Sequence, residues 1–295
     1  MEVDVDRLTP GMILEKDVLG KSGNPIVEKH TKLTETHIEF IKHFLFDKVS
    51  VAPFVHHSVD KITATEKQQI AVNQDNQLFT NTFEKAVQHY KKLFSSWQNS
   101  VPINMYLVRK FFVPLFDEAS ELNIDKIISL LPTSNTKDYF YKRTVLMSLL
   151  SVYLAKKLNF KKKDWLQIGL ASILSDSGIA KLKGLSKSKN IPEETMRLHP
   201  IYSYRMVENE PTLTQHAKIA ILQHHEYLDG SGYPANTSGK KVIVYARIIN
   251  VCDLFLSVYS NNHKEIISVL EDYKHNKLDP IIVQQLVSEL CRDSE

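Results

Sequence analysis

The sequence predicts a mainly α-helical protein that begins with a small α+β module. From Leu78 onward, apolar residues recur at the spacing of helices that bury one face. Before residue 53, short extended segments flank one helical segment, and a cluster of turn residues separates two of them. A run of helices that follows a short mixed segment is typical of a helical domain with an appended module.

The composition is that of a globular protein with a substantial core. Of the 295 residues, 43% are hydrophobic and 24% are charged. The formal net charge of +3 is too small to indicate a nucleic-acid polymer as partner. No apolar run approaches the roughly 18 residues that a membrane span needs, and the acidic start MEVDVDRLTP does not resemble a signal peptide. The two cysteines, Cys252 and Cys291, lie far apart, so we expect no disulfide and a cytoplasmic location.

Residues 1–52 are expected to form the α+β module. Thr34 is a candidate N-cap for a helix that buries Ile38 and Ile41. Residues 53–77 are polar and weakly patterned, which predicts a linker. Extended segments are expected at 12–14, 18–19, 25–27 and 48–51.

The rest of the chain is expected to be helical, as a connecting segment at 78–135 and a domain at 136–295. An aromatic stripe marks the first of these helices, at Phe79, Phe83, Tyr90, Phe94 and Trp97. Such a stripe is most often core or a helix–helix contact, and the alternative is a ligand surface. The aromatic helices at 78–98 and 103–122 could also form a contact in a homodimer. Further helices are expected at about 138–158, 164–176, 199–208, 212–227, 243–259, 263–273 and 279–292.

The stretch HHEYLDGSGYP at 224–234 is the most informative part of the sequence for chemistry. Neighbouring side chains on a helix diverge by about 100°, so adjacent histidines bind one metal ion only near a helix end. They can also serve two metal ions, or a metal ion and a substrate. Taken alone, such a pair is more often structural. The residues that follow the pair favour a functional site over a structural role. Gly230 and Gly232 permit close backbone approach, and Pro234 fixes the turn.

HHEYLDGSGYP resembles the HHExxDGxGYP motif of the HD-GYP family. Leu198-His199-Pro200 is similar to the family's upstream HP segment, and 246–253, with the sequence ARIINVCD, is similar to a downstream helix. The similarity covers roughly residues 136–275. A weaker similarity relates residues 8–12 to the small module that precedes some HD-GYP domains.

The resemblance implies an all-helical HD-GYP domain, a centre of two or three metal ions, often iron or manganese, and hydrolysis of cyclic di-GMP. It implies that Asp176 has the catalytic role, here in a weakened site. It also implies that the loop of Gly232, Tyr233 and Pro234 binds substrate. The metal ligands that it carries over are Asp176, His199, His224, His225 and Asp253.

Several positions depart from the family pattern. Ser175 stands where the HD motif has histidine, Ile179 where a lysine follows it, and Lys142 where the first helix carries a histidine ligand. The phosphate-binding arginines expected near 259–264 are missing. A serine hydroxyl is a poor ligand and an ammonium group is none. We therefore expect at most one divalent metal ion, iron, manganese or zinc.

Lys142 suggests a further hypothesis. Its ammonium group would neutralise Asp176 and Asp253 in place of the missing cation, because an unpaired buried carboxylate is costly. The alternative is that Lys142 points to solvent.

Three functional interpretations remain open. The preferred one is a degenerate HD-GYP signalling protein that acts by binding a protein partner or a cyclic dinucleotide, with weak or no cyclic di-GMP phosphodiesterase activity. The second is an active metal-dependent phosphodiesterase for cyclic di-GMP or another phosphoester. The third is a structural scaffold without metal.

Overall fold

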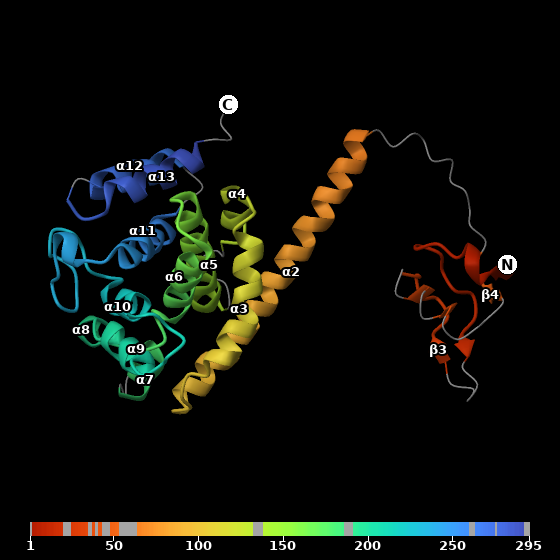
Figure 1. Cartoon of the computed structure of the whole chain (residues 1–295), viewed down its shortest axis with the longest axis horizontal. Coiled ribbons are helices and arrows are strands. Elements are labelled where there is room, and N and C mark those ends of the chain that lie inside the picture. The colour runs from red at the N-terminus through yellow and green to blue at the C-terminus, as the bar shows by residue number, and fades with distance from the viewer. Residues whose placement is uncertain are drawn as a thin grey trace. The chain divides into compact units, whose positions relative to one another are not determined.

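The computed structural model describes residues 2–19, 25–34, 37–38, 41–42, 48–52, 64–131, 138–185, 191–259, 263–274 and 276–291. The chain divides into two compact units, Met1–Gln69 and Ile70–Glu295 (Figure 1). Among the described residues, no helix combines the length and apolar character that crossing a membrane requires. The fold is mainly α, with a small α+β unit first, as the sequence predicts.

The first unit contains two short antiparallel strand pairs. Strand β1 (Glu2–Asp4) pairs with β4 (Lys48–Ser50), and β2 (Val18–Leu19) pairs with β3 (Pro25–Val27). A 3₁₀ turn, η1 (Val5–Arg7), follows β1. The Thr34 hydroxyl accepts a hydrogen bond from the His37 N–H at 3.3 Å, and Ile38 and Ile41 are buried, as predicted. Strand β1 was not predicted from the sequence.

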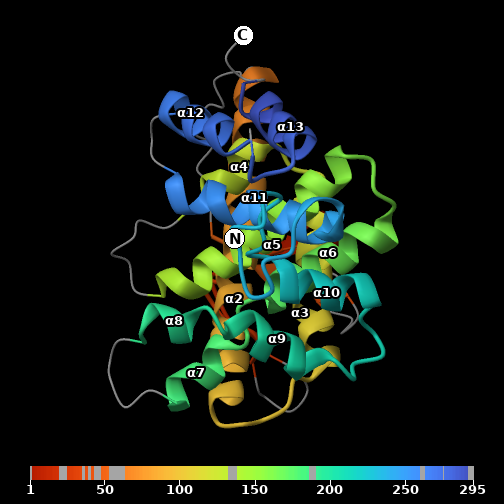
Figure 2. The ribbon, with the colours of Figure 1, turned by 90° about the vertical axis from the view of Figure 1, so that its left-hand side faces the viewer.

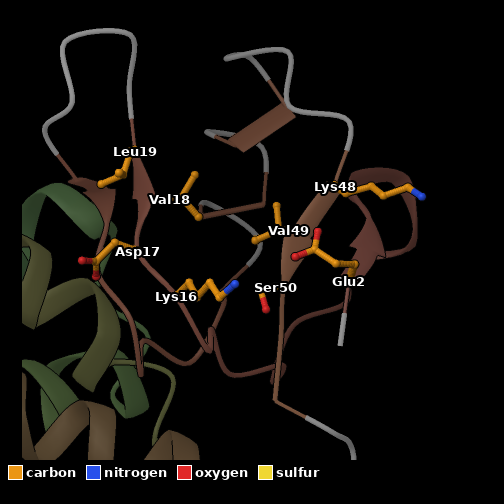
Figure 3. A pocket seen from close by; sticks show the side chains of 8 residues that line it. All are labelled: Glu2, Lys16, Asp17, Val18, Leu19, Lys48, Val49 and Ser50. Carbon is orange, nitrogen blue, oxygen red and sulfur yellow. The ribbon is translucent and has the colours of Figure 1, made fainter.

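An open groove lies between β2 and β4 of this unit (Figure 3). Val18 and Val49 line it, and charged side chains, among them Lys16, Asp17 and Lys48, lie around them. None of the sequence-predicted site residues belongs to this unit.

The second unit is helical. Helix α5 (Tyr139–Lys157) is its centre, because all residues from Thr144 to Ala155 are buried and the helix packs against four or more neighbours. The helices at either end of the unit are well separated from one another, with α7, α8 and α9 at one end and α12 and α13 at the other (Figures 1 and 2).

The remaining helices are α2 (Ala64–Gln98), α3 (Met105–Ala119), α4 (Ile124–Ile128), α6 (Lys162–Leu174), α7 (Ile179–Leu185), α8 (Glu193–Met196), α9 (His199–Val207), α10 (Gln215–Gln223), α11 (Val244–Val258), α12 (His263–Lys274) and α13 (Pro280–Leu290). A 3₁₀ turn, η2 (Gly239–Lys241), precedes α11.

Helix α2 differs from the sequence expectation at its start. It begins at Ala64, so residues 64–77 of the expected linker are helical, and residues 53–63 lie outside the described residues. The segment is rich in glutamine and contains two alanines, which favour a helix, but it has too few apolar residues to give an apolar stripe. The absence of that stripe explains why it resembled a linker.

The aromatic stripe of α2 is part of the core. Phe79, Phe83, Tyr90, Phe94 and Trp97 are each at most 1% exposed and belong to the same buried cluster as the apolar residues of α3. Their burial in the core of one chain shows that the alternative of a ligand surface is wrong for this stripe. A homodimer stays a prediction.

Candidate metal centre

Four potential ligands come together from three places in the second unit. Asp176 follows α6, His199 begins α9, and His224 and His225 follow the last residue of α10. Each offers a ligand atom within 4.8 Å of the others. The two adjacent histidines lie beyond Gln223, where the helix has ended, so their side chains are not forced apart as they are within a helix.

Backbone carbonyls fix the orientation of two of the imidazoles. His199 Nδ1 lies 2.7 Å from Met196 O, and His224 Nδ1 lies 2.8 Å from Ile221 O. A carbonyl oxygen only accepts, so both Nδ1 atoms carry a proton, and both Nε2 atoms are directed to the centre. Metal-binding histidines usually donate their other ring N–H to a backbone carbonyl or a carboxylate in this way.

The free ring nitrogens face the Asp176 carboxylate. The two Nε2 atoms are 3.1 Å apart, and Asp176 Oδ1 lies 3.3 Å from that of His199 and 3.7 Å from that of His224. Two imidazole nitrogens and a carboxylate oxygen at such distances suit a shared cation. Three imidazoles with one carboxylate are a donor set that iron, manganese or zinc accepts, so the residues present fit a divalent metal ion.

The protonation states agree with metal binding. Burial alone would raise the pKa of the Asp176 carboxyl, but hydrogen bonding and charge attraction from His199 and His224 hold that pKa well below its ordinary value. Burial, together with the neighbouring His224 and His199, holds the pKa of His225 well below its ordinary value. Asp176 is therefore ionised and His225 neutral, which are the forms that bind metal ions.

The segment that carries Asp176 is tied to helix α9. The Ser203 hydroxyl donates to Ser175 O at 2.6 Å and accepts from Gly178 N at 2.8 Å. A Cβ atom on Gly178 would lie 2.3 Å from His199 O, so only glycine allows this approach. Ser175 is fully buried, and its hydroxyl donates to Ser172 O at 2.9 Å. Ile179 begins α7 and packs against the core.

The Gly-Tyr-Pro loop closes over His225. The Tyr233 ring stacks on the His225 ring at a centroid distance of 4.7 Å, and Tyr233 N donates to His225 O at 3.1 Å. The Tyr233–Pro234 peptide bond is cis. A Cβ atom on Gly232 would lie 2.4 Å from His225 O, so this position also needs glycine. Burial and the nearby carboxylates raise the pKa of Tyr233, so its hydroxyl stays protonated.

A buried glutamate holds this loop. Glu226 is 1% exposed, and its two carboxylate oxygens accept hydrogen bonds from Ala235 N at 2.7 Å and Thr237 N at 2.9 Å. Asn250 on α11 donates to Glu226 O at 2.7 Å. Loop, metal ligands and α11 therefore form one hydrogen-bonded assembly.

Arg143, and not Lys142, is the cation of α5 that faces the centre. Arg143 Nη2 donates to Asp253 Oδ1 at 2.8 Å and to Asp253 O at 2.9 Å. Lys142 instead pairs with Glu84 of α2. The hypothesis that the Lys142 ammonium neutralises Asp176 and Asp253 is therefore wrong, and so is the alternative that Lys142 simply points to solvent.

Asp253 lies beside the four-residue cluster and is not part of it. Its Oδ2 is 3.6 Å from His225 Nδ1, while its Oδ1 is bonded to Arg143. The structure thus brings Asp176, His199, His224 and His225 together and places Asp253 at their edge, engaged by a guanidinium group.

Sequence reasoning missed the roles of Arg143, Gly178, Ser203, Glu226 and Asn250. Only Glu226 lies within the HHEYLDGSGYP stretch that drew attention to the site. The others act through tertiary contacts that no local pattern reveals.

Comparison with known proteins places the chain in a family. Residues 132–282 match the HD domain family. The chain is similar to the cyclic di-GMP phosphodiesterase PA4108 of Pseudomonas aeruginosa, with 26% identity over 140 residues, which are 46% of this chain and 34% of that protein. It is also similar to the cyclic di-GMP phosphodiesterase response regulator RpfG of Xanthomonas campestris, with 29% identity over 120 residues, 39% of this chain and 32% of that protein. The chain thus spans about a third of the length of these relatives.

A solved structure shares the fold along nearly the whole chain. Bd1817, an HDGYP protein from Bdellovibrio bacteriovorus, is 16% identical, with a TM-score of 0.53, and the alignment covers 98% of this chain and 99% of that one. With the family match and the HHEYLDGSGYP segment, we conclude that the chain belongs to the HD domain family as an HD-GYP-type protein.

Proposed function

We propose that the chain is a signalling protein whose HD-GYP-type domain binds one divalent metal ion and a cyclic dinucleotide, and hydrolyses that ligand weakly or not at all. The observation that carries this proposal is the one four-residue ligand set found among the described residues, with Asp253 held by Arg143 at its edge. The names of the relatives, cyclic di-GMP phosphodiesterases, support a cyclic dinucleotide as the ligand class.

The residues present supply part of what phosphodiester hydrolysis needs. A bound metal ion would lower the pKa of a water molecule and polarise a phosphoryl oxygen. Asp176 and the three histidines would hold that ion, and the Tyr233 loop covers His225 on one side. Two-metal enzymes stabilise both the attacking and the leaving oxygen, and a single ion gives up one half of this stabilisation. Slow turnover follows from that loss.

An active phosphodiesterase is the second candidate. The observation that favours it is that the matched relatives are named phosphodiesterases. Binding of a protein partner, homodimerisation and a cytoplasmic location stay predictions from the sequence.

The deciding experiment measures metal content and cyclic di-GMP turnover on one anaerobic preparation. We expect one metal ion per chain and turnover at or near background. We expect His224→Ala to lower metal affinity by more than about a hundredfold. Replacing a residue that only hydrogen-bonds a metal ligand already lowers metal affinity by about 10–100-fold. His216→Ala is the control, because His216 is an exposed histidine of α10 outside the ligand cluster.

Each other outcome favours a different interpretation. Two metal ions with rapid turnover would establish the active enzyme and overturn the proposal. A protein that binds no metal, and whose His224→Ala variant behaves like the wild type, would instead support a structural scaffold.

A further inference from the structure

Arg143 and Asp253 form a partly buried ion pair at the edge of the metal cluster. The two side chains are 18% and 20% exposed, and one guanidinium nitrogen contacts both the carboxylate and the backbone carbonyl of Asp253. Two contacts to one residue fix the guanidinium in place, which a flexible surface pair does not achieve.

The guanidinium group lies among the negative charges of the centre. Burial would lower the pKa of Arg143, but attraction to Asp253 and Asp176 outweighs it and raises that pKa. The other oxygen of Asp253 faces His225, which belongs to the ligand cluster. The positive charge of Arg143 is thus close enough to attract the carboxylates of both Asp253 and Asp176.

Arg143 also keeps unused hydrogen-bond donors. A guanidinium has five N–H groups, and the hydrogen bonds of Arg143 within the described part of the chain all start from Nη2. A second guanidinium contacts the Gly-Tyr-Pro loop, because Arg197 is 4.8 Å from the ring centroid of Tyr233, and Tyr233 stacks on His225. Arginine side chains thus lie at Asp253 and at Tyr233, although residues 259–264 lack arginine.

We propose that Arg143 takes the place of a second metal ion and, with its remaining N–H groups, forms the cationic side of a binding site for a phosphate group of the ligand. This inference rests on the proposed function, since it needs a metal ion at Asp176, His199, His224 and His225. The guanidinium neutralises Asp253 and so confines the divalent ion to these four ligands. It presents a planar set of donors, which suits a phosphate oxygen pair.

The first test counts metal ions. Wild type, Arg143→His and Lys142→His are titrated with Mn²⁺, and binding is followed by equilibrium dialysis and by electron paramagnetic resonance, which distinguishes isolated from coupled manganese. An imidazole at position 143 would be a metal ligand and would free Asp253. We therefore expect one ion in wild type and two coupled ions in Arg143→His.

Lys142→His is the matched control for this test. It places the same imidazole one residue away on α5, where the native side chain pairs with Glu84 of α2. We expect it to bind one ion, like the wild type. A single uncoupled ion in a folded Arg143→His protein would overturn the inference and leave the proposed function standing. A wild type that binds no ion, or two, would overturn the proposed function itself.

The second test uses inorganic phosphate as the probe and does not depend on a newly created metal site. Its affinity for the manganese-loaded protein is measured by calorimetry in wild type, Arg143→Gln and Lys142→Gln. Loss of a charge-assisted contact predicts an affinity lower by about tenfold or more for Arg143→Gln. Lys142→Gln is expected to stay within about twofold of wild type, because that side chain is directed to α2. Equal affinities in all three proteins would refute the phosphate role of Arg143.

Discussion

Glu226 gives the sharpest prediction about how the Gly-Tyr-Pro loop is held. Its buried carboxylate accepts one hydrogen bond from Ala235 N and one from Thr237 N, at 2.7 and 2.9 Å. Glu226→Gln preserves size and shape but turns one acceptor into an NH₂ group, which would face a backbone N–H. One of the two hydrogen bonds is lost, and the new NH₂ group, itself a donor, faces a backbone N–H that is also a donor.

The expected size of the effect follows from these contacts. A hydrogen bond to a charged group contributes about 1.5–3 kcal/mol, so loss of one of the two should destabilise the closed loop by about 2 kcal/mol. That free energy corresponds to a roughly thirtyfold larger population of the open loop.

Hydrogen exchange measures this population directly. The amide protons of Ala235 and Thr237 should exchange roughly thirtyfold faster in Glu226→Gln, while amides in the middle of α5 should be unaffected. Asp229→Asn is the matched control, because Asp229 lies in the same loop but is exposed and accepts hydrogen bonds from Ser231. Unchanged exchange at both amides in Glu226→Gln would show that the carboxylate does not hold the loop.

Two further substitutions test the packing around the site. Gly232→Ala would place a methyl group 2.4 Å from His225 O. We therefore expect the free energy of unfolding, measured with denaturant, to fall by about 1–3 kcal/mol, and Mn²⁺ to bind more weakly. Wild-type stability and wild-type Mn²⁺ affinity in this variant would contradict the close approach. Tyr153→Phe removes a hydroxyl that donates to the buried Glu289 at 2.5 Å and ties α5 to α13. We expect Tyr153→Phe to lower the free energy of unfolding by about 1–2 kcal/mol and the thermal midpoint by about 3–6 °C, while the metal content stays constant. An unchanged thermal midpoint would mean that this hydrogen bond adds no stability.

The helical unit was largely predictable because its long helices repeat an apolar pattern over many residues. Helix α5, predicted at about 138–158, runs from Tyr139 to Lys157. Short elements were not predictable in this way: α7 and α8, with seven and four residues, are too short for a periodic signal. Residues 64–77 of α2 were missed for the opposite reason, since a helix without an apolar stripe has propensity but no pattern.

The candidate ligands were identified through the resemblance of the HHEYLDGSGYP and HP segments, and the structure brings four of them together. Metal binding itself stays a prediction. The role of Arg143 was assigned to its neighbour, because the sequence does not say which of two adjacent residues on a helix faces inward. An error of one position turns a side chain by about 100° around the helix axis, and here it exchanged a contact with α11 for one with α2.

The adjacent residues Lys142 and Arg143 have a mechanical consequence for the unit. One ties α5 to Glu84 of α2, and the other ties it to Asp253 of α11. Helix α5 is therefore fastened on two sides within a single turn, close to the ligand cluster. Sliding α2 past α11 must break one of these ion pairs or rotate α5, and rotation of α5 would carry Arg143 away from Asp253. A displacement of α2 and the contact between Arg143 and Asp253 are thus linked through two consecutive side chains.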